Sequence, residues 1–156
     1  PPTHQNIWWT KVTYGQFHQL RSATHCGVLF MFQERTGGYW LNVKHKIAKT
    51  AYGGYGGDKD YKLLEPEEFV GKWNDIVVHA RWTKDRDGFL KVWVNGEKKV
   101  VWDGKTLTCR EIWFKYGIYR SRVSSSPLSK TVTTIAYYDG VVRSKSRDGM
   151  FDPLPE

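Results

Sequence analysis

The sequence predicts an all-β protein, a sandwich or barrel built from about nine short strands. Three observations predict this fold class. Helical periodicity is almost absent. Runs rich in β-branched and aromatic residues alternate between apolar and polar positions, and turn signals separate these runs at regular spacing. At 156 residues the chain fits a single domain that is long enough to bury a core.

The predicted strands cover 7–20, 27–34, 39–46, 73–83, the two halves of 89–102, 111–121 and 131–144. RTGG at 35–38 is expected to form a hairpin loop between two of them. Asn95-Gly96 is the strongest hairpin signal, because a type I′ turn needs positive φ at both central positions. The stretch 64–73 is expected to hold one short helical turn.

Two segments are predicted to lie outside the strands. AYGGYGGDKDY (51–61) is not a phosphate loop, because no GK[ST] follows it and no helix opens after it. It is either a flexible surface loop or a mobile aromatic lid beside a binding groove. The polar, proline-containing tail at 143–156 is expected to pack irregularly or to fray.

The net charge of +8 and the pI of about 9.5 favour a polyanionic partner. Nucleic acid, an acidic polysaccharide and an anionic membrane surface all fit this charge. No apolar run approaches the ~18 residues that span a bilayer. The start PPTHQN, without an initiator Met or signal peptide, suggests a processed or trimmed product. Cys26 and Cys109 form either one disulfide or two buried thiols.

The strand at 14–20, YGQFHQL, carries an amide and an imidazole on one face. Alternation places Tyr14, Gln16, His18 and Leu20 on the same side. Two such groups, two residues apart, can reach one ligand. Taken alone, a histidine in a strand is more often structural.

The strand at 111–121, EIWFKYGIYRS, has a similar polar face made of Lys115, Gly117 and Tyr119. A glycine inside a strand weakens it and often marks the close approach of a ligand or of another backbone. The opposite face is expected to lie in the core, and it carries Phe114, Tyr116 and Ile118.

Other chemistries fit the sequence poorly. The five histidines include no HExxH and no pair at ligand spacing, which disfavours a zinc site. No GxSxG is present, and the acidic residues lie mostly in or near turns, where a paired-carboxylate glycosidase would not place them. No RRM, cold-shock or zinc-finger signature supports nucleic-acid binding. Asp139 is either a calcium ligand or, more simply, a turn residue.

QFH (16–18) followed by WFKYGIYRS (113–121) resembles the Q-[IVFW]-H and Y-F-K-x-G-[IV]-Y pair of the jelly-roll polysaccharide lyases. These include the alginate lyases and, closer still, the heparin lyase I-like and glucuronan lyase-like enzymes. The two hairpins at 73–100 and the segment TTIAYYDGVV (133–142) also resemble those enzymes, so the likeness covers roughly residues 10–142.

This resemblance implies a concanavalin A-like β-jelly roll sandwich. Such enzymes usually run well above 156 residues and have N-terminal strands ahead of the Q-x-H strand, which would be missing here. We therefore expect residues 1–156 to form a single polysaccharide-lyase-like β-sandwich domain, or the C-terminal part of a longer domain whose N-terminal half lies elsewhere.

The resemblance also implies β-elimination on a uronic-acid-containing polysaccharide. Gln16 would bind the C6 carboxylate, and His18 and Tyr119 would act as acid and base. Lys115 would bind the carboxylate or a neighbouring anion, or would lower the pKa of the tyrosine. Further substrate contacts are expected from the rings of Tyr14, Tyr52, Trp8 and Trp9 and, along the edge of the groove, from Arg120 and Arg122.

The expected partner is an acidic polysaccharide, rather than nucleic acid or a membrane, and the expected location is secreted or periplasmic. The chemistry requires no cofactor, although structural calcium occurs among such enzymes. The alternative is a non-catalytic, lectin-like carbohydrate-binding module on the same fold, since a fold does not fix a function.

Overall fold

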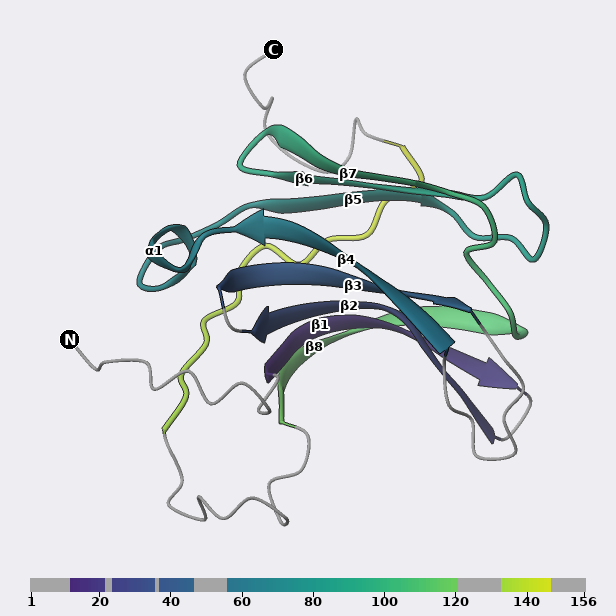
Figure 1. The fold of residues 1–156 in the computed structure, drawn as a ribbon, viewed down its shortest axis with the longest axis horizontal. Helices are drawn as coiled ribbons and strands as arrows, with labels where there is room; N and C mark the ends of the chain where they lie inside the picture. The colour runs from purple at the N-terminus through teal and green to yellow at the C-terminus, as the bar shows by residue number, and fades with distance from the viewer. Residues whose placement is uncertain (1–11, 22–23, 36, 47–55, 121–132, 147–156) are drawn as a thin grey trace.

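The computed structural model describes residues 12–21, 24–35, 37–46, 56–120 and 133–146. These residues form two antiparallel sheets and one helical turn, which confirms the all-β sandwich (Figure 1). The larger sheet has the order β4 (Gly56–Leu64), β3 (Gly38–Lys46), β2 (Thr24–Arg35), β1 (Val12–Arg21), β8 (Glu111–Arg120). The smaller sheet has the order β5 (Ile76–Arg81), β6 (Phe89–Val94), β7 (Glu97–Asp103).

The core lies between the two sheets. The larger sheet is curved, and the smaller sheet lies over one of its faces (Figure 1). Strand β6 shows the alternation that builds this core, because Leu90, Val92 and Val94 are buried while the residues between them are only partly buried. Phe30 and Leu41 of the larger sheet belong to the same cluster. Each such side chain contributes about 1.5–3 kcal/mol by its burial. Among the described residues, no second sheet lies over the other face of the curved sheet.

The predicted turns are present. Asn95 and Gly96 have φ values of 51° and 81° and join β6 to β7, as a type I′ turn requires. Strands β2 and β3 form the predicted hairpin, with Arg35 opposite Gly38. The helical turn is α1 (Pro66–Phe69), which has proline at its start and a capping box formed by Glu65 and Glu68.

Three predictions about the fold are wrong. The second half of the predicted loop 51–61 belongs to β4, where residues 56–61 pair with β3; residues 51–55 lie outside the described part. Residues 133–142 form no strand, although a strand was predicted over 131–144. Within the described part of the tail, 143–146 is irregular as expected.

The third wrong prediction concerns the apolar face of β8. Phe114, Tyr116 and Ile118 are 42%, 55% and 43% exposed instead of buried. The physical reason is the position of the strand, because β8 is the edge of the curved sheet opposite to β4, and β4 is the edge whose backbone lies next to β7 of the smaller sheet. Among the described residues, Tyr138 contacts this face, with its ring 5.3 Å from that of Tyr116.

Cys109 is disulfide-bonded, which agrees with the first of the two alternatives for the cysteines. The side chain of Cys26 lies outside the described part of the structure. In the residues that are described, no helix has the length and apolar character to cross a membrane.

Gln19 ties the start of β8 to β1. Its side chain is fully buried, and its Oε1 accepts hydrogen bonds from the backbone N–H groups of Thr108 and Cys109, at 2.7 and 3.1 Å. We expect Gln19→Leu to lower the free energy of unfolding by about 2–4 kcal/mol, because it leaves two partly buried backbone donors unpaired. Urea denaturation measures this change.

The control for Gln19→Leu is Gln33→Leu, since Gln33 is also buried but accepts no hydrogen bond at its Oε1. Because Gln33 Nε2 donates to Thr13 Oγ1 at 3.0 Å, we expect that substitution to cost about 1 kcal/mol, which is less than the loss in Gln19→Leu, where two backbone hydrogen bonds disappear. Equal losses in both variants would contradict the role given to the Gln19 carbonyl.

Candidate active site

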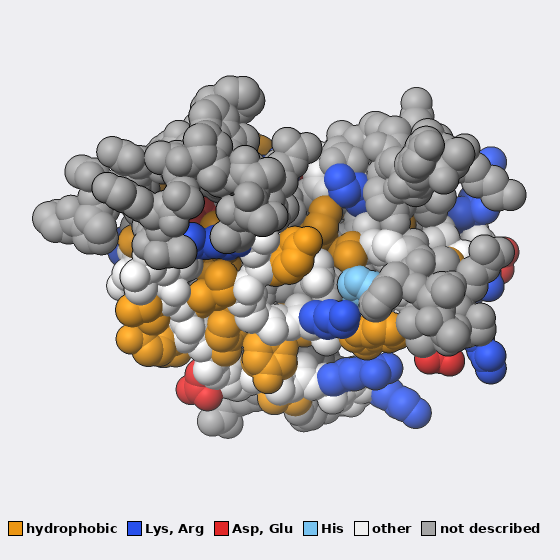
Figure 2. Space-filling model, turned by 90° about the horizontal axis from the view of Figure 1, so that it is seen from below, with side chains coloured by type: hydrophobic (Ala, Val, Ile, Leu, Met, Phe, Trp, Pro, Cys, Tyr) orange, Lys and Arg blue, Asp and Glu red, His pale blue; other side chains and the backbone are white. Residues whose placement is uncertain are grey.

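A row of residues that is polar except for Met31 crosses the open face of the curved sheet. Gln16 on β1 lies opposite Lys115 on β8 and Met31 on β2. The row continues from Met31 to Asn42 on β3 and Asp60 on β4. Directly opposite residues share a face of a sheet, so these side chains line one surface. Figure 2 views this surface, on which a histidine lies among Lys and Arg side chains.

A bulge brings a second row into the same surface. Thr13 lies opposite Tyr119 on β8 and Gln33 on β2, and the register then shifts between Thr13 and Gly15 on both sides. An extra residue in a strand reverses the alternation beyond it. Thr13 and Gln16 therefore share a face although they are three residues apart. Gly117 lies in the shifted part of β8 with a φ of 132°, a value that side chains rarely adopt.

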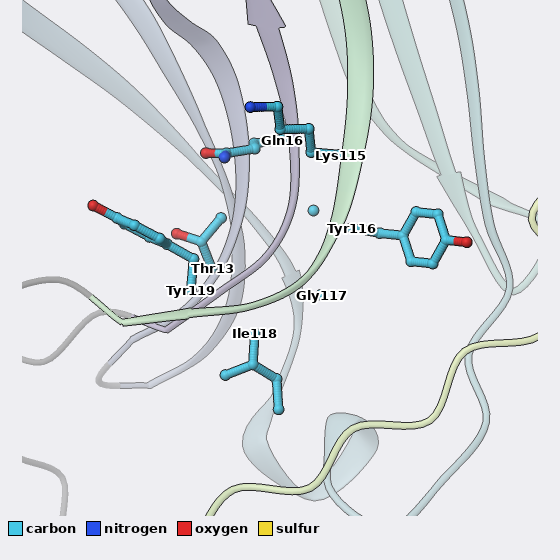
Figure 3. Close-up of a pocket in the computed structure, with 8 residues that line it drawn as sticks. Thr13, Gln16, Lys115, Tyr116, Gly117, Ile118 and Tyr119 are labelled. Carbon is cyan, nitrogen blue, oxygen red and sulfur yellow. The ribbon is translucent and has the colours of Figure 1, made fainter.

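The two rows enclose a shallow pocket (Figure 3). Gln16, Lys115 and Tyr119 extend to one side of the β8 ribbon, and Tyr116 and Ile118 to the other (Figure 3). A Cβ added at Gly117 would meet no atom within 4 Å, so the space beside it is open. The pocket is lined by Thr13, Gly15, Gln16, Lys115, Tyr116, Gly117, Ile118 and Tyr119.

His18 lies next to this pocket but does not line it. Its partner on β8 is Trp113, and the two rings stack with centroids 5.6 Å apart. The Lys115 ammonium lies 5.5 Å from the centre of the same indole. Trp113 therefore joins His18 to Lys115. Along the strands, His18 and Tyr119 flank the Gln16–Lys115 pair, one on each side.

The cations of the open face differ in their pairing. At the β2–β4 end, Arg35 forms a salt bridge with Asp60, and Asn42 Nδ2 donates to the same carboxylate at 2.6 Å. Lys62 is paired with Glu65 at 2.8 Å. No carboxylate among the described residues pairs with Lys115. Among these cations on the described part of this face, Lys115 is therefore the one that is available to an anionic ligand in the pocket.

Several predicted contact residues do not lie at the pocket. Tyr14 was predicted to share a face with Gln16, and this is wrong, because the bulge turns it to the core side. There its ring packs on Phe69 with centroids 5.4 Å apart, and its hydroxyl donates to Glu34 at 2.7 Å. Burial, reinforced by the Glu34 carboxylate, raises the pKa of Tyr14.

The predicted arginine contacts also fall away from the pocket or outside the described residues. Arg120 lies opposite Val12, next to the Thr13–Tyr119 pair, so alternation directs it to the core side of the sheet rather than to the open face. Residues Arg122, Tyr52, Trp8 and Trp9 lie outside the described part of the chain.

Asp139 behaves as a turn residue, since its carboxylate accepts a hydrogen bond from the N–H of Gly140 at 2.8 Å. Across the described ranges, no three His, Cys, Asp or Glu side chains gather as a metal site requires.

Thr13 and Trp113 are among the residues at the site that were not predicted from the sequence. Thr13 lies beyond the bulge, so simple alternation assigned it to the wrong face. Trp113 shares its face with Lys115 by alternation alone, and that spacing could have identified it.

The motifs, the pocket and the sandwich together agree with the comparison against known families. The model of the polysaccharide lyase family matches residues 4–142, and the chain belongs to that family. Among solved structures, it is similar to the endo-β-1,4-glucuronan lyase from the fungus Trichoderma reesei, with a TM-score of 0.53 and 16% identity. The fold is accordingly a β-jelly-roll sandwich.

The chain spans only about half the length of that enzyme. The similarity covers 80% of this chain and 54% of the glucuronan lyase chain. No curated protein matches the sequence.

Proposed function

We propose that this chain cleaves a uronic-acid-containing polysaccharide by β-elimination. The observation that carries the proposal is the pocket in which an amide, an ammonium and a phenol from Gln16, Lys115 and Tyr119 lie together. The imidazole of His18 lies next to the pocket on the same face of the sheet, where it stacks on Trp113. A binding site for a neutral sugar would have no need of this combination of proton-transfer groups and an unpaired cation.

The chemistry explains each residue type. The C5–H bond of a uronate can break only if the negative charge on its C6 carboxylate is stabilised as electrons move toward it. Gln16 and Lys115 supply the donor and the cation for this task. One of Tyr119 and His18 removes the C5 proton, and the other gives a proton to the departing O4. The C5–H electron pair becomes the C4–C5 double bond as the C4–O4 bond breaks.

Glucuronan is the first substrate to test, because the similar solved enzyme is a glucuronan lyase. The net charge of +8 supports a polyanion in general, since it attracts an acidic chain at long range. We propose that the protein is secreted or periplasmic, because its expected substrates, acidic polysaccharides, occur outside the cytoplasm.

The deciding experiment incubates the protein with glucuronan, alginate and heparin and follows the ultraviolet absorbance of the new C4–C5 double bond. We expect absorbance to rise with a uronate polymer and not with a neutral glucan. Tight binding without any double-bond product would instead indicate a non-catalytic, lectin-like module.

In this proposal no cofactor takes part in the chemistry, because side chains supply every donor and proton-transfer group. Calcium would serve only the structure. The same assay after treatment with a chelator, and again after adding calcium back, separates these roles. A loss of activity that is matched by a loss of thermal stability would indicate a structural ion.

A further inference from the structure

Thr13 is a hydroxyl at the floor of the pocket that has no part in the mechanism described so far. Its side chain is 3% exposed, yet it lines the pocket beside Gln16, Lys115 and Tyr119. It faces Tyr119 on one neighbouring strand and Gln33 on the other. A buried hydroxyl normally has hydrogen-bond partners, so the groups that donate to its oxygen and accept its proton need to be identified.

Gln33 fixes which role the hydroxyl plays. Gln33 Nε2 donates to Thr13 Oγ1 at 3.0 Å and also contacts the Met31 sulfur at 3.7 Å. A thioether accepts a hydrogen bond but cannot donate one, which keeps the nitrogen of the amide on this side. The Thr13 oxygen therefore accepts, and its own proton remains to be donated. In the described part of the structure, no other group forms a hydrogen bond with the Thr13 hydroxyl.

The remaining proton is available to the pocket. In Figure 3 the Thr13 hydroxyl, the Gln16 amide and the Lys115 amine all extend to the same side of β8. Gln33 is itself 5% exposed and packed in the sheet. Because its own side chain is fixed, it holds the Thr13 hydroxyl in one orientation. A donor held in this way needs little reorganisation when an anion binds.

From this geometry we infer that the Thr13 hydroxyl donates a hydrogen bond to the substrate carboxylate, beside Gln16 and Lys115, and that Gln33 positions it. The inference rests on the proposed function and adds a third group to its carboxylate site. Thr13 would touch the substrate, whereas Gln33 would act only through Thr13.

The test compares Thr13→Val, which resembles threonine in shape but has no hydroxyl, with Thr13→Ser, which keeps it. On the polymer that the wild type cleaves, we expect Thr13→Val to lower kcat/KM by roughly 10- to 100-fold, as for a lost hydrogen bond to a charged group. Thr13→Ser should stay within about threefold of the wild type. Equal values for the two variants would overturn the inference.

Gln33→Met separates positioning from fold stability. It removes the donor to Thr13 but keeps the hydroxyl, so kcat/KM should fall less than in Thr13→Val. If Thr13 only satisfied Gln33, both substitutions would lower kcat/KM and the melting temperature by the same degree.

A binding measurement makes the test independent of turnover. Calorimetry compares a uronate oligosaccharide with the same oligosaccharide after its carboxylates are reduced to alcohols. Thr13→Val should weaken binding of the uronate alone, and equal weakening of both would overturn the inference. A wild type that binds the uronate but forms no double bond with any polymer would refute the proposed function and leave this comparison valid.

Discussion

Tyr119→Phe is expected to lower the rate of double-bond formation by roughly 10²- to 10⁴-fold, the range that a positioned acid or base contributes. The change removes one oxygen and leaves the ring in place. Tyr119 is 59% exposed, and no described residue forms a hydrogen bond with its hydroxyl, so the fold loses nothing. A lower rate would therefore come from the missing proton-transfer group and not from a less stable fold. Initial rates on the cleaved polymer, together with thermal unfolding, measure both quantities.

The matched control for this prediction is Tyr137→Phe. Tyr137 is 77% exposed and lies against Trp73, with ring centroids 6.4 Å apart, and it does not line the pocket. We expect this control to keep the wild-type rate. A Tyr119→Phe variant that retained more than about a tenth of the activity would remove Tyr119 from the acid–base pair.

His18→Ala belongs to the same prediction, because elimination needs both a base and an acid. Its rate should fall by a similar factor, and the double variant should be little slower than either single one. When two groups act together in one step, the rate losses caused by substituting each of them do not add up in the double variant. Additive losses would indicate two independent roles.

Local sequence signals predicted the hairpins well. The Asn95-Gly96 turn and the β2–β3 hairpin depend only on residues that are close in sequence, and both are present. The pairing of β1 with β8 joins segments about a hundred residues apart. No periodicity could predict that pairing, and the resemblance to a known family implied only that the residues of the two motifs serve one site.

The bulge on β1 explains what sequence reasoning missed in the site. Strict alternation assigns Tyr14 to the face of Gln16 and leaves Thr13 on the other face. One extra residue in the strand reverses both assignments. Nothing in the residues themselves marks this position, because the bulge is a property of the pairing with β2 and β8.

The exposed apolar face of β8 could not be predicted for a different reason. Alternation correctly separates Phe114 and Tyr116 from the face of Lys115. Whether such a face is buried depends on how far the opposite sheet extends, and among the described residues the three strands of the smaller sheet do not cover it. Sequence alternation shows which residues share a face of a strand, but it does not show whether another sheet buries that face.

Lys115→Met should lower kcat/KM by roughly 10²-fold or more, because it removes the cation from the proposed carboxylate site. It also lowers the net charge by one, which weakens the long-range attraction of a polyanion. Comparison with Lys98→Met separates the loss of the direct contact with the carboxylate from the loss of one positive charge. Lys98 lies 5.4 Å from the centre of the Trp93 ring, as Lys115 lies 5.5 Å from that of Trp113, but it belongs to the smaller sheet.

Both variants lose the same charge and the same kind of cation–π contact, so long-range attraction falls equally in both. We expect Lys98→Met to reduce kcat/KM by less than about threefold and to approach the wild type as salt screens the charge. The defect of Lys115→Met should persist at high salt, because a group in direct contact with the carboxylate is screened far less than a distant one. A set of kcat/KM values measured across a range of sodium chloride concentrations decides the matter. If the two variants lose activity equally and converge at high salt, Lys115 acts only as part of the overall charge and does not contact the substrate carboxylate.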